Sequence, residues 1–147
     1  MNRLRRVVFD TSTLVSAALR VGSVPHRALA HVLSAGEVCV SAATLAELEE
    51  VLTRPKFDRY QSADARRGFA AIVRRHAALF TVSEGTEFNL PSPCRDPKDN
   101  KFLALIQACE ADALVSSDAD LLVLHPWQNV PILTPAAFLA MAIHKHR

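Results

Sequence analysis

Four acidic residues that lie far apart in the chain have the types and positions that metal-assisted hydrolysis uses. Asp10 and Asp118 are each the first acid after a short apolar run that suits a buried strand, and each precedes an expected helix. Ligand sites in parallel α/β sheets lie outside the carboxyl ends of the strands, so these two carboxylates can converge. Glu47 and Asp99 belong to expected helices, where each alone is an ordinary surface acid or helix cap. The four residues therefore indicate a site only when they are taken together.

A cluster of four carboxylates has a definite electrostatic requirement. Like charges gathered in one cleft repel each other and are costly to keep ionised without a cation. Oxygen ligands without nearby histidine or cysteine suit Mg²⁺ or Mn²⁺ rather than zinc, and the three cysteines of this chain have no Cys-x-x-Cys spacing. Such ions can activate water and stabilise the charge that develops on a phosphate. Hydrolysis of a phosphodiester bond is therefore the chemistry that these residues predict.

The secondary structure that should position these acids alternates between strands and helices. Strands are expected at Leu4–Phe9, Val38–Val40, Leu79–Val82, Ala113–Val115 and Val130–Leu133. Helices are expected from Thr11 to Leu19, over Pro25–Ala35 and Ala42–Thr53, from Ser62 to about Ala78, from Asp99 to about Glu110, over Ala119–Leu124, and onward from Thr134-Pro135. This alternation implies an α/β sandwich around a mostly parallel sheet.

Length and composition fit an ordinary globular protein with one core. A chain of 147 residues suits a single domain over residues 1–147, since one core commonly occupies about 100 to 200 residues. Half of the residues are apolar and 22% are charged, which excludes the disordered and fibrous classes. No stretch reaches the ~18 consecutive apolar residues that span a bilayer, and the Val7-Val8-Phe9 run is too short for a secretion signal. We therefore expect a cytoplasmic protein without a membrane partner.

Opposite charges are concentrated in two different segments. Residues 54–75 hold seven basic side chains and two acidic ones, whereas residues 84–120 hold eight acidic side chains and three basic ones. That separation is compatible with a basic surface for a polyanion next to an acidic centre that needs cations, although a charge run is more often a solvated helix face. The candidate contacts for a polyanion or a partner are Arg54, Lys56, Arg66, Arg67, Arg74 and Arg75. The paired arginines of the helix after Ser62 should face outward.

Four stretches of this sequence resemble the acidic motifs of PIN domains. They are VVFDTSTLVSA from Val7, LAEL from Leu45 together with VLTRPK from Val51, DPKDNKFL from Asp96, and LVSSDADLL from Leu114. Their order and spacing cover nearly the whole chain, from Val7 to Phe138, and the set is specific although each fragment alone is weak. The resemblance is closest to the bacterial branch of VapC-like toxins from toxin/antitoxin pairs.

The resemblance makes four acids the metal-binding and catalytic residues: Asp10, Glu47, Asp99 and Asp118. Asp120 and Asp96 lie close to them in the sequence and are candidate ligands of lower standing. The family often has an asparagine two residues after its first aspartate and a threonine before its fourth acid. This chain has Ser12 and Ser117 there, and both retain a hydroxyl. We expect these two serines to orient the acids, with an effect on activity that the pattern leaves open.

The resemblance also implies an overall structure and a set of partners. The family fold is a three-layer α/β/α sandwich, and its members typically cleave RNA with Mg²⁺ or Mn²⁺. Many members dimerise, and the toxins are neutralised by a small antitoxin whose tail blocks the cleft. For this chain the expected partners are therefore an RNA substrate, a small antitoxin protein and a second copy in a homodimer.

Two other functions remain open at this point. The first is a catalytically weak or inactive PIN-fold module that binds RNA or a partner, which the serines at positions 12 and 117 motivate. Retention of all four acids argues against it, because a pure RNA binder gains nothing from clustered negative charge. The second is a haloacid-dehalogenase-like phosphatase, because the turn after Phe9 resembles the nucleophile turn of that family. That family requires a second aspartate where Ser12 stands, and this short chain lacks its cap domain.

Overall fold

A five-stranded parallel sheet forms the centre of the protein in a computed structural model that describes residues 4–145. The strands are β1 (Arg6–Phe9), β2 (Glu37–Val40), β3 (Ala78–Leu79), β4 (Ala113–Val115) and β5 (Ile132–Leu133). Their order is β3-β2-β1-β4-β5, and each neighbouring pair is parallel. The prediction of a mostly parallel sheet is confirmed. Because the strands run in one direction, their carboxyl ends all lie at one edge.

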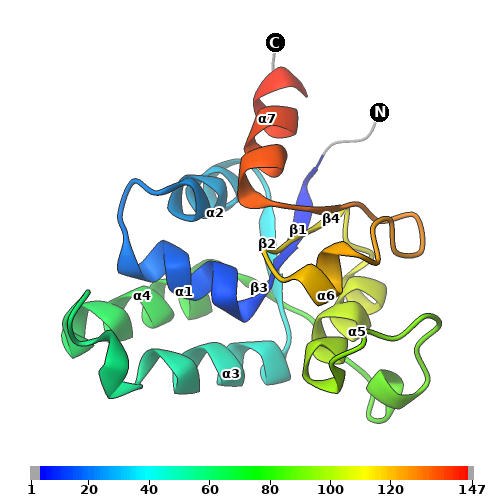
Figure 1. The fold of residues 1–147 in the computed structure, drawn as a ribbon, viewed down its shortest axis with the longest axis horizontal. Coiled ribbons are helices and arrows are strands. Elements are labelled where there is room, and N and C mark those ends of the chain that lie inside the picture. Colours follow the sequence, from blue (N-terminus) through cyan, green and yellow to red (C-terminus); the bar gives the residue numbers. More distant parts are fainter. Residues whose placement is uncertain (1–3, 146–147) are drawn as a thin grey trace.

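Helices cover both faces of this sheet. They are α1 (Thr11–Leu19), α2 (Val24–Ala35), α3 (Ala42–Leu52), α4 (Ala63–His76), α5 (Asn100–Cys109), α6 (Ala119–Leu122) and α7 (Pro135–Lys145). In Figure 1, α1, α3 and α4 lie on one side of the strands, and α5 and α6 lie on the other. The three-layer α/β/α arrangement is therefore confirmed. Within the described span, no helix is both long enough and apolar enough to cross a membrane.

The alternation of side chains along the strands creates a separate core on each face. Val7 and Phe9 of β1 pack into a cluster with the helices α1, α2, α3, α4 and α7. Val8, between them, packs into the second cluster, which includes α5, α6 and the buried Trp127. All three strand residues are at most 3% exposed. A strand buried on both faces reads as a continuous apolar run, which is why its position was predictable from the sequence.

Polar residues at the ends of the strands begin the helices that follow them. Asp10 caps α1 by accepting a hydrogen bond from the Thr13 backbone N–H at 3.0 Å. Ser41 caps α3 in a reciprocal capping box with Thr44. Caps of this kind satisfy backbone donors that have no partner within the helix. The sheet edge therefore carries helix N-termini and polar side chains together.

Several element boundaries differ from the prediction, most of them by one or two residues. β3 covers Ala78–Leu79 rather than Leu79–Val82, because the chain leaves the sheet after the Phe80 N–H bonds the carbonyl of β2 at 2.8 Å. β5 begins at Ile132 rather than Val130. Asp99 is the N-cap residue of α5, as expected, but it also ends the 3₁₀ turn η3 (Pro97–Asp99), and its side chain makes no capping hydrogen bond. Two features favour η3 at this position: Pro97 begins the turn, and the Asp96 side chain caps it.

Candidate active site

Asp10 lies at the carboxyl end of β1 and is only 3% exposed. One carboxylate oxygen, Oδ2, accepts hydrogen bonds from the hydroxyls of Ser116 at 2.5 Å and Ser12 at 3.3 Å. The other oxygen accepts the capping bond from Thr13. Burial raises the pKa of Asp10, and the hydrogen bonds from Ser116, Thr13 and Ser12 partly offset that rise by stabilising the charged form. The side chain is thus held in one orientation at the sheet edge.

The hydroxyl that holds Asp10 most closely belongs to Ser116, which the sequence reasoning overlooked. The parallel register pairs Phe9 of β1 with Val115 of β4, so the next residues, Asp10 and Ser116, lie side by side. Ser116 is fully buried, whereas Ser117, the expected orienting residue, is exposed. The structure therefore moves this role from Ser117 to Ser116. Aligning the two predicted strands by their last apolar residues would have revealed it.

Asp118 is fixed beside Asp10 by the same serine. The Asp118 backbone N–H donates to the Ser116 hydroxyl oxygen at 2.9 Å. The Asp118 side chain caps α6 by accepting the Asp120 backbone N–H at 2.8 Å. One serine therefore contacts both acids that follow β1 and β4. Asp120 meets Asp118 through its backbone and is itself half-buried.

Asp99 reaches the same edge from the turn before α5, where burial and neighbouring acids disfavour the charged form of its carboxylate. Its Oδ2 atom is buried and has no hydrogen-bond partner within residues 4–145. Burial raises the pKa of Asp99 to about 7, with further contributions from the nearby charges of Asp118, Asp96 and Asp10. Asp99 is thus near Asp118 and Asp10, which Ser116 links to each other.

The turn that carries Asp99 is held by polar contacts on both sides. Asn100, at the start of α5, accepts the Cys94 backbone N–H at 2.7 Å through its side-chain oxygen and is buried. Asp96 accepts the Lys98 backbone N–H at 3.0 Å, so its carboxylate serves the turn in this structure. These contacts fix the loop before α5. They explain how Asp99, at the junction of η3 and α5, can hold a defined position.

Glu47 joins the site from α3 through two contacts. Its carboxylate accepts hydrogen bonds from the Thr11 hydroxyl and from the Lys101 ammonium, the latter at 2.9 Å. Thr11 directly follows Asp10, and Lys101 lies two residues after Asp99. Glu47 therefore lies on the same side of the molecule as the other acids, with its negative charge paired. Neither Thr11 nor Lys101 was predicted, because both contacts join distant parts of the chain.

The donor set fits a hard divalent cation by its chemistry. The converging side chains offer carboxylate oxygens alone, which Mg²⁺ and Mn²⁺ prefer. The partnerless oxygen of Asp99 and the mutual repulsion of the acids are features that a cation would relieve. In the part of the chain that the structure describes, no three Asp, Glu, His or Cys side chains are already arranged as a metal site. Metal binding would therefore require side-chain adjustment.

One of the six basic residues proposed as surface contacts is not on the surface. Arg66 was expected to face outward from the helix after Ser62, but it is 2% exposed. Its guanidinium donates to the Asp58 carboxylate at 2.7 Å and to the Gln61 carbonyl at 3.1 Å. The expectation for Arg66 is therefore wrong. Arg66 links α4 to the preceding segment, which contains Asp58 and Gln61. Helical periodicity does not reveal this contact, because it depends on how the chain turns before α4.

The other five basic residues are exposed, and three of them make ion pairs. Arg54 pairs with Glu50, Arg67 with Asp64, and Arg74 with Glu49 of α3. Lys56 and Arg75 are exposed. Arg74 donates two hydrogen bonds of 2.9 Å to Glu49, which join the surfaces of α3 and α4 and lower the pKa of Glu49. Part of the basic charge is thus neutralised by neighbouring acids.

Comparison with known proteins identifies the fold. The sequence profile of the PIN domain family matches residues 6–120. VapC20 of Mycobacterium tuberculosis, a sarcin-ricin loop cleaving toxin, superposes with a TM-score of 0.55 at 16% identity, covering 81% of this chain and 95% of the toxin. A chain of VapBC2 from Rickettsia felis, in a complex with a DNA fragment from its promoter, gives 0.60 at 14% identity, covering 86% and 96%. At these identities the likeness shows a shared fold. No curated protein matches the sequence.

Proposed function

Because this chain belongs to the PIN domain family, we propose that it is a metal-dependent ribonuclease that hydrolyses RNA phosphodiester bonds at the carboxylate cluster. The observation that carries the proposal is the environment of Asp99, whose buried Oδ2 atom has no hydrogen-bond partner among residues 4–145 and whose charged form burial and the nearby Asp118, Asp96 and Asp10 disfavour. Such crowding is costly for stability and is typical of sites that bind cations or catalyse reactions.

Each acid has a role in this proposal that follows from its surroundings. Asp10, Asp99 and Asp118 would hold Mg²⁺ or Mn²⁺, with Asp10 kept in place by Ser116. When bound, the ion favours ionisation of water and offsets the charge that develops on the phosphate. Glu47, paired with Lys101, borders the site and is the fourth ligand candidate.

Two further acids and one serine have weaker roles in the proposal. Asp120 and Asp96 remain ligand candidates of lower standing, since each is half-buried near the cluster. The Asp96 carboxylate would have to leave its bond to the Lys98 backbone to bind an ion. Ser12 donates to Asp10 at 3.3 Å and is proposed to help orient it.

We further propose that the protein is the toxin of a toxin/antitoxin pair. One neighbour in fold is a toxin that cleaves the sarcin-ricin loop, and another comes from a VapBC complex. By analogy with these neighbours, the substrate is RNA and a small antitoxin binds the toxin. From the sequence alone, we also propose that two copies form a homodimer in the cytoplasm. The whole chain, residues 1–147, acts as one domain in this proposal. Exposed Arg54, Lys56, Arg67, Arg74 and Arg75 are its candidate contacts for RNA or the antitoxin.

The second candidate function is a PIN-fold module that binds RNA or a partner with little or no turnover. It is favoured by the absence, among residues 4–145, of three potential ligands already arranged around an ion position. The raised pKa of Asp99 favours the nuclease, because a binding surface for a polyanion has no use for crowded acids. The PIN family match favours both over a phosphatase of the haloacid-dehalogenase type.

The nuclease proposal is tested by RNA cleavage with purified protein. Structured and unstructured RNAs are incubated with wild-type protein in Mg²⁺, Mn²⁺ or EDTA, beside Asp10→Asn and a control, Asp64→Asn. Asp64 is an exposed acid on α4, away from the cluster, so its variant should cleave as the wild type does. We expect Asp10→Asn to lose at least about a hundredfold in rate while its circular dichroism spectrum stays unchanged. Cleavage that persists in EDTA or in Asp10→Asn would remove the assignment, and RNA binding without cleavage would favour the second candidate.

A further inference from the structure

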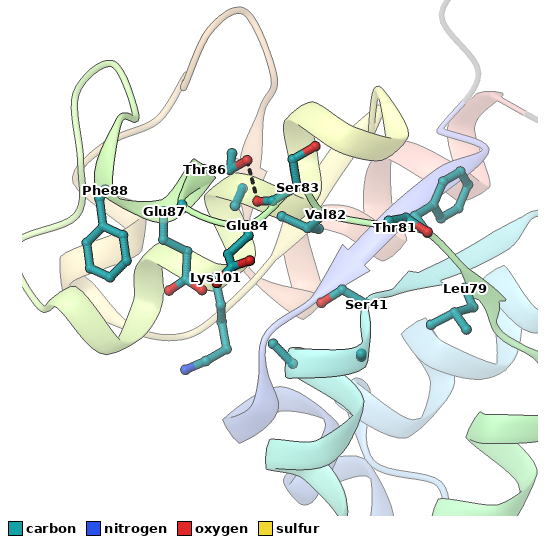
Figure 2. Close-up of a pocket in the computed structure, with 15 residues that line it drawn as sticks. Ser41, Leu79, Thr81, Val82, Ser83, Glu84, Thr86, Glu87, Phe88 and Lys101 are labelled. Atoms are coloured by element: carbon teal, nitrogen blue, oxygen red, sulfur yellow. Dashed lines mark hydrogen bonds between the residues drawn. The ribbon is translucent and has the colours of Figure 1, made fainter.

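A cavity next to the carboxylate cluster has no assigned role. Its volume is about 410 Å³, which falls within the range of roughly 300 to 1,000 Å³ that is usual for small-ligand pockets. Its walls come from the start of α3, from residues 79–88 and from α5. In Figure 2, Ser41 lies on one side of this cavity, and Phe88, Glu87 and Lys101 lie on the other. The cavity is large enough for one planar ring system.

Lys101 connects this cavity with the acids. It lines the cavity, and its ammonium lies 2.9 Å from the Glu47 carboxylate, which contacts Thr11 beside Asp10. The cavity wall therefore contacts Glu47, the acid that borders the cluster, through the Lys101 side chain. A group held in the cavity would lie beside Lys101, which contacts this border of the cluster.

Phe88 gives the cavity an aromatic rim. Its side chain is 90% exposed, the highest value among the large apolar residues of residues 4–145, and Leu79 across the cavity is 67% exposed. Phe88 ends the 3₁₀ turn η2 (Thr86–Phe88), which the Thr86 hydroxyl fixes by donating to the Ser83 carbonyl at 2.7 Å. Gly85 precedes the turn at φ 83°, a conformation that glycine adopts without strain. The local backbone therefore keeps the Phe88 ring exposed to solvent at the rim of the cavity.

The charged residues of the cavity indicate what kind of group would enter it. Glu84 and Glu87 both line it, and a phosphate would be repelled there. Carboxylates instead accept hydrogen bonds from the amino groups of nucleobases, as in the pairing of Glu with the cytosine amino group. An aromatic face together with carboxylate acceptors therefore fits a base, and not the backbone of a nucleic acid.

We propose that this cavity binds one unpaired nucleobase of the RNA next to the phosphate that is cleaved. Phe88 stacks on the base, and Glu84 and Glu87 accept hydrogen bonds from its amino group. The inference rests on the proposed ribonuclease function, to which it adds a substrate preference. Cytosine, adenine and guanine carry such an amino group, whereas uracil does not, so single-stranded RNA with an amino-bearing base at this position binds more tightly.

Binding of short fluorescent RNAs tests the inference separately from cleavage. Fluorescence anisotropy is measured with oligocytidine and oligouridine in Mg²⁺, using protein that carries Asp10→Asn so that the RNA stays intact. We expect Phe88→Ala to weaken oligocytidine binding by about tenfold or more, since one stacked base contributes that much to affinity. Glu84→Ala combined with Glu87→Ala should abolish the preference for cytidine over uridine, because alanine has no side-chain acceptor for the amino group. Tyr60→Ala, which removes another exposed aromatic ring outside the cavity, should bind as the parent does.

The outcomes separate the failure of this inference from the failure of the proposed function. Wild-type protein that cleaves RNA, combined with unchanged oligocytidine binding in Phe88→Ala, would overturn the base site while the nuclease stands. In that case any ligand of the cavity would be of another class, such as a peptide. Protein that neither binds nor cleaves RNA would overturn both. Loss of affinity in Tyr60→Ala but not in Phe88→Ala would place the RNA on a different surface and would also overturn the inference.

Discussion

Replacing Asp99 by asparagine should stabilise the protein at neutral and alkaline pH in the absence of divalent metal. Burial and neighbouring acids raise the pKa of Asp99 from 3.8 to about 7 in the folded protein. Between these two pH values the folded state retains a proton that the unfolded chain has lost. The contribution of the Asp99 carboxyl group to the free energy of unfolding is therefore fully present below about pH 4. It falls as the pH rises toward 7 and stays low at higher pH. The asparagine side chain of the variant has no carboxyl group to titrate, so this fall should disappear.

The size of the effect follows from the pKa difference. A rise from 3.8 to about 7 is roughly 3 units, and each unit corresponds to about 1.36 kcal/mol, which gives an upper limit of about 4 kcal/mol. Asp99 is only partly buried, so water and salt screen part of the repulsion, and we expect roughly 2 kcal/mol at pH 8. For a chain of this length, that gain corresponds to a rise in Tm of roughly 4 to 8 °C.

Thermal and urea unfolding in EDTA at pH 4.5 and at pH 8 measure this difference. Asparagine keeps the shape of the side chain and adds an N–H that can donate to Asp118, so the variant should fold normally. Glu84→Gln serves as the control, because it removes one exposed acidic charge that is not among the nearby charges raising the pKa of Asp99. Equal stability of wild type and Asp99→Asn at pH 8, or a variant that is less stable there, would refute the electrostatic reasoning. A stabilisation equal to that of Glu84→Gln would mean that net charge alone is responsible.

Two further predictions concern residues that the structure assigned differently from the sequence. Arg66→Ala should lose roughly 1 to 3 kcal/mol in urea unfolding, since it removes a buried charge-assisted hydrogen bond, whereas Arg67→Ala should change stability by no more than about 0.5 kcal/mol. Equal effects of the two changes would mean that Arg66 is not buried. Ser116→Ala should lower the rate of RNA cleavage at saturating RNA and weaken Mn²⁺ binding, because Asp10 loses its closest hydrogen bond, whereas Ser117→Ala should leave both unchanged. The reverse order would restore the original assignment.

The sequence was sufficient for the strands, the caps and the edge of the sheet at which the acids lie. Val7 to Phe9 is buried on both faces, so hydrophobicity alone marks it as a strand. Ser41 and Ser62 were expected caps, and both accept hydrogen bonds from the first turns of α3 and α4. These features depend on neighbours within a few residues. The metal-binding roles of the acids remain a prediction, because convergence alone does not show a bound ion.

Contacts between distant segments lay beyond sequence reasoning. Glu47 and Lys101 are 54 positions apart, and no local pattern indicates that they meet. Arg66 belongs to an arginine pair that resembles a solvated helix face, yet the turn before α4 brings Asp58 against it. Ser116 is the exception, because the register of two correctly predicted strands was enough to place it beside Asp10. Strand pairing could therefore have revealed this one distant side-chain contact, although Ser117 and not Ser116 was the predicted residue.

Binding of Mn²⁺ to the purified protein tests most directly whether the clustered carboxylates form a metal centre. Free Mn²⁺ is followed by electron paramagnetic resonance during titration of wild-type protein and of Asp10→Asn. We predict saturable binding to the wild type that Mg²⁺ displaces and that Asp10→Asn loses. Absence of saturable binding to the wild type, or the same binding curve for Asp10→Asn, would contradict the metal centre and with it the proposed hydrolysis.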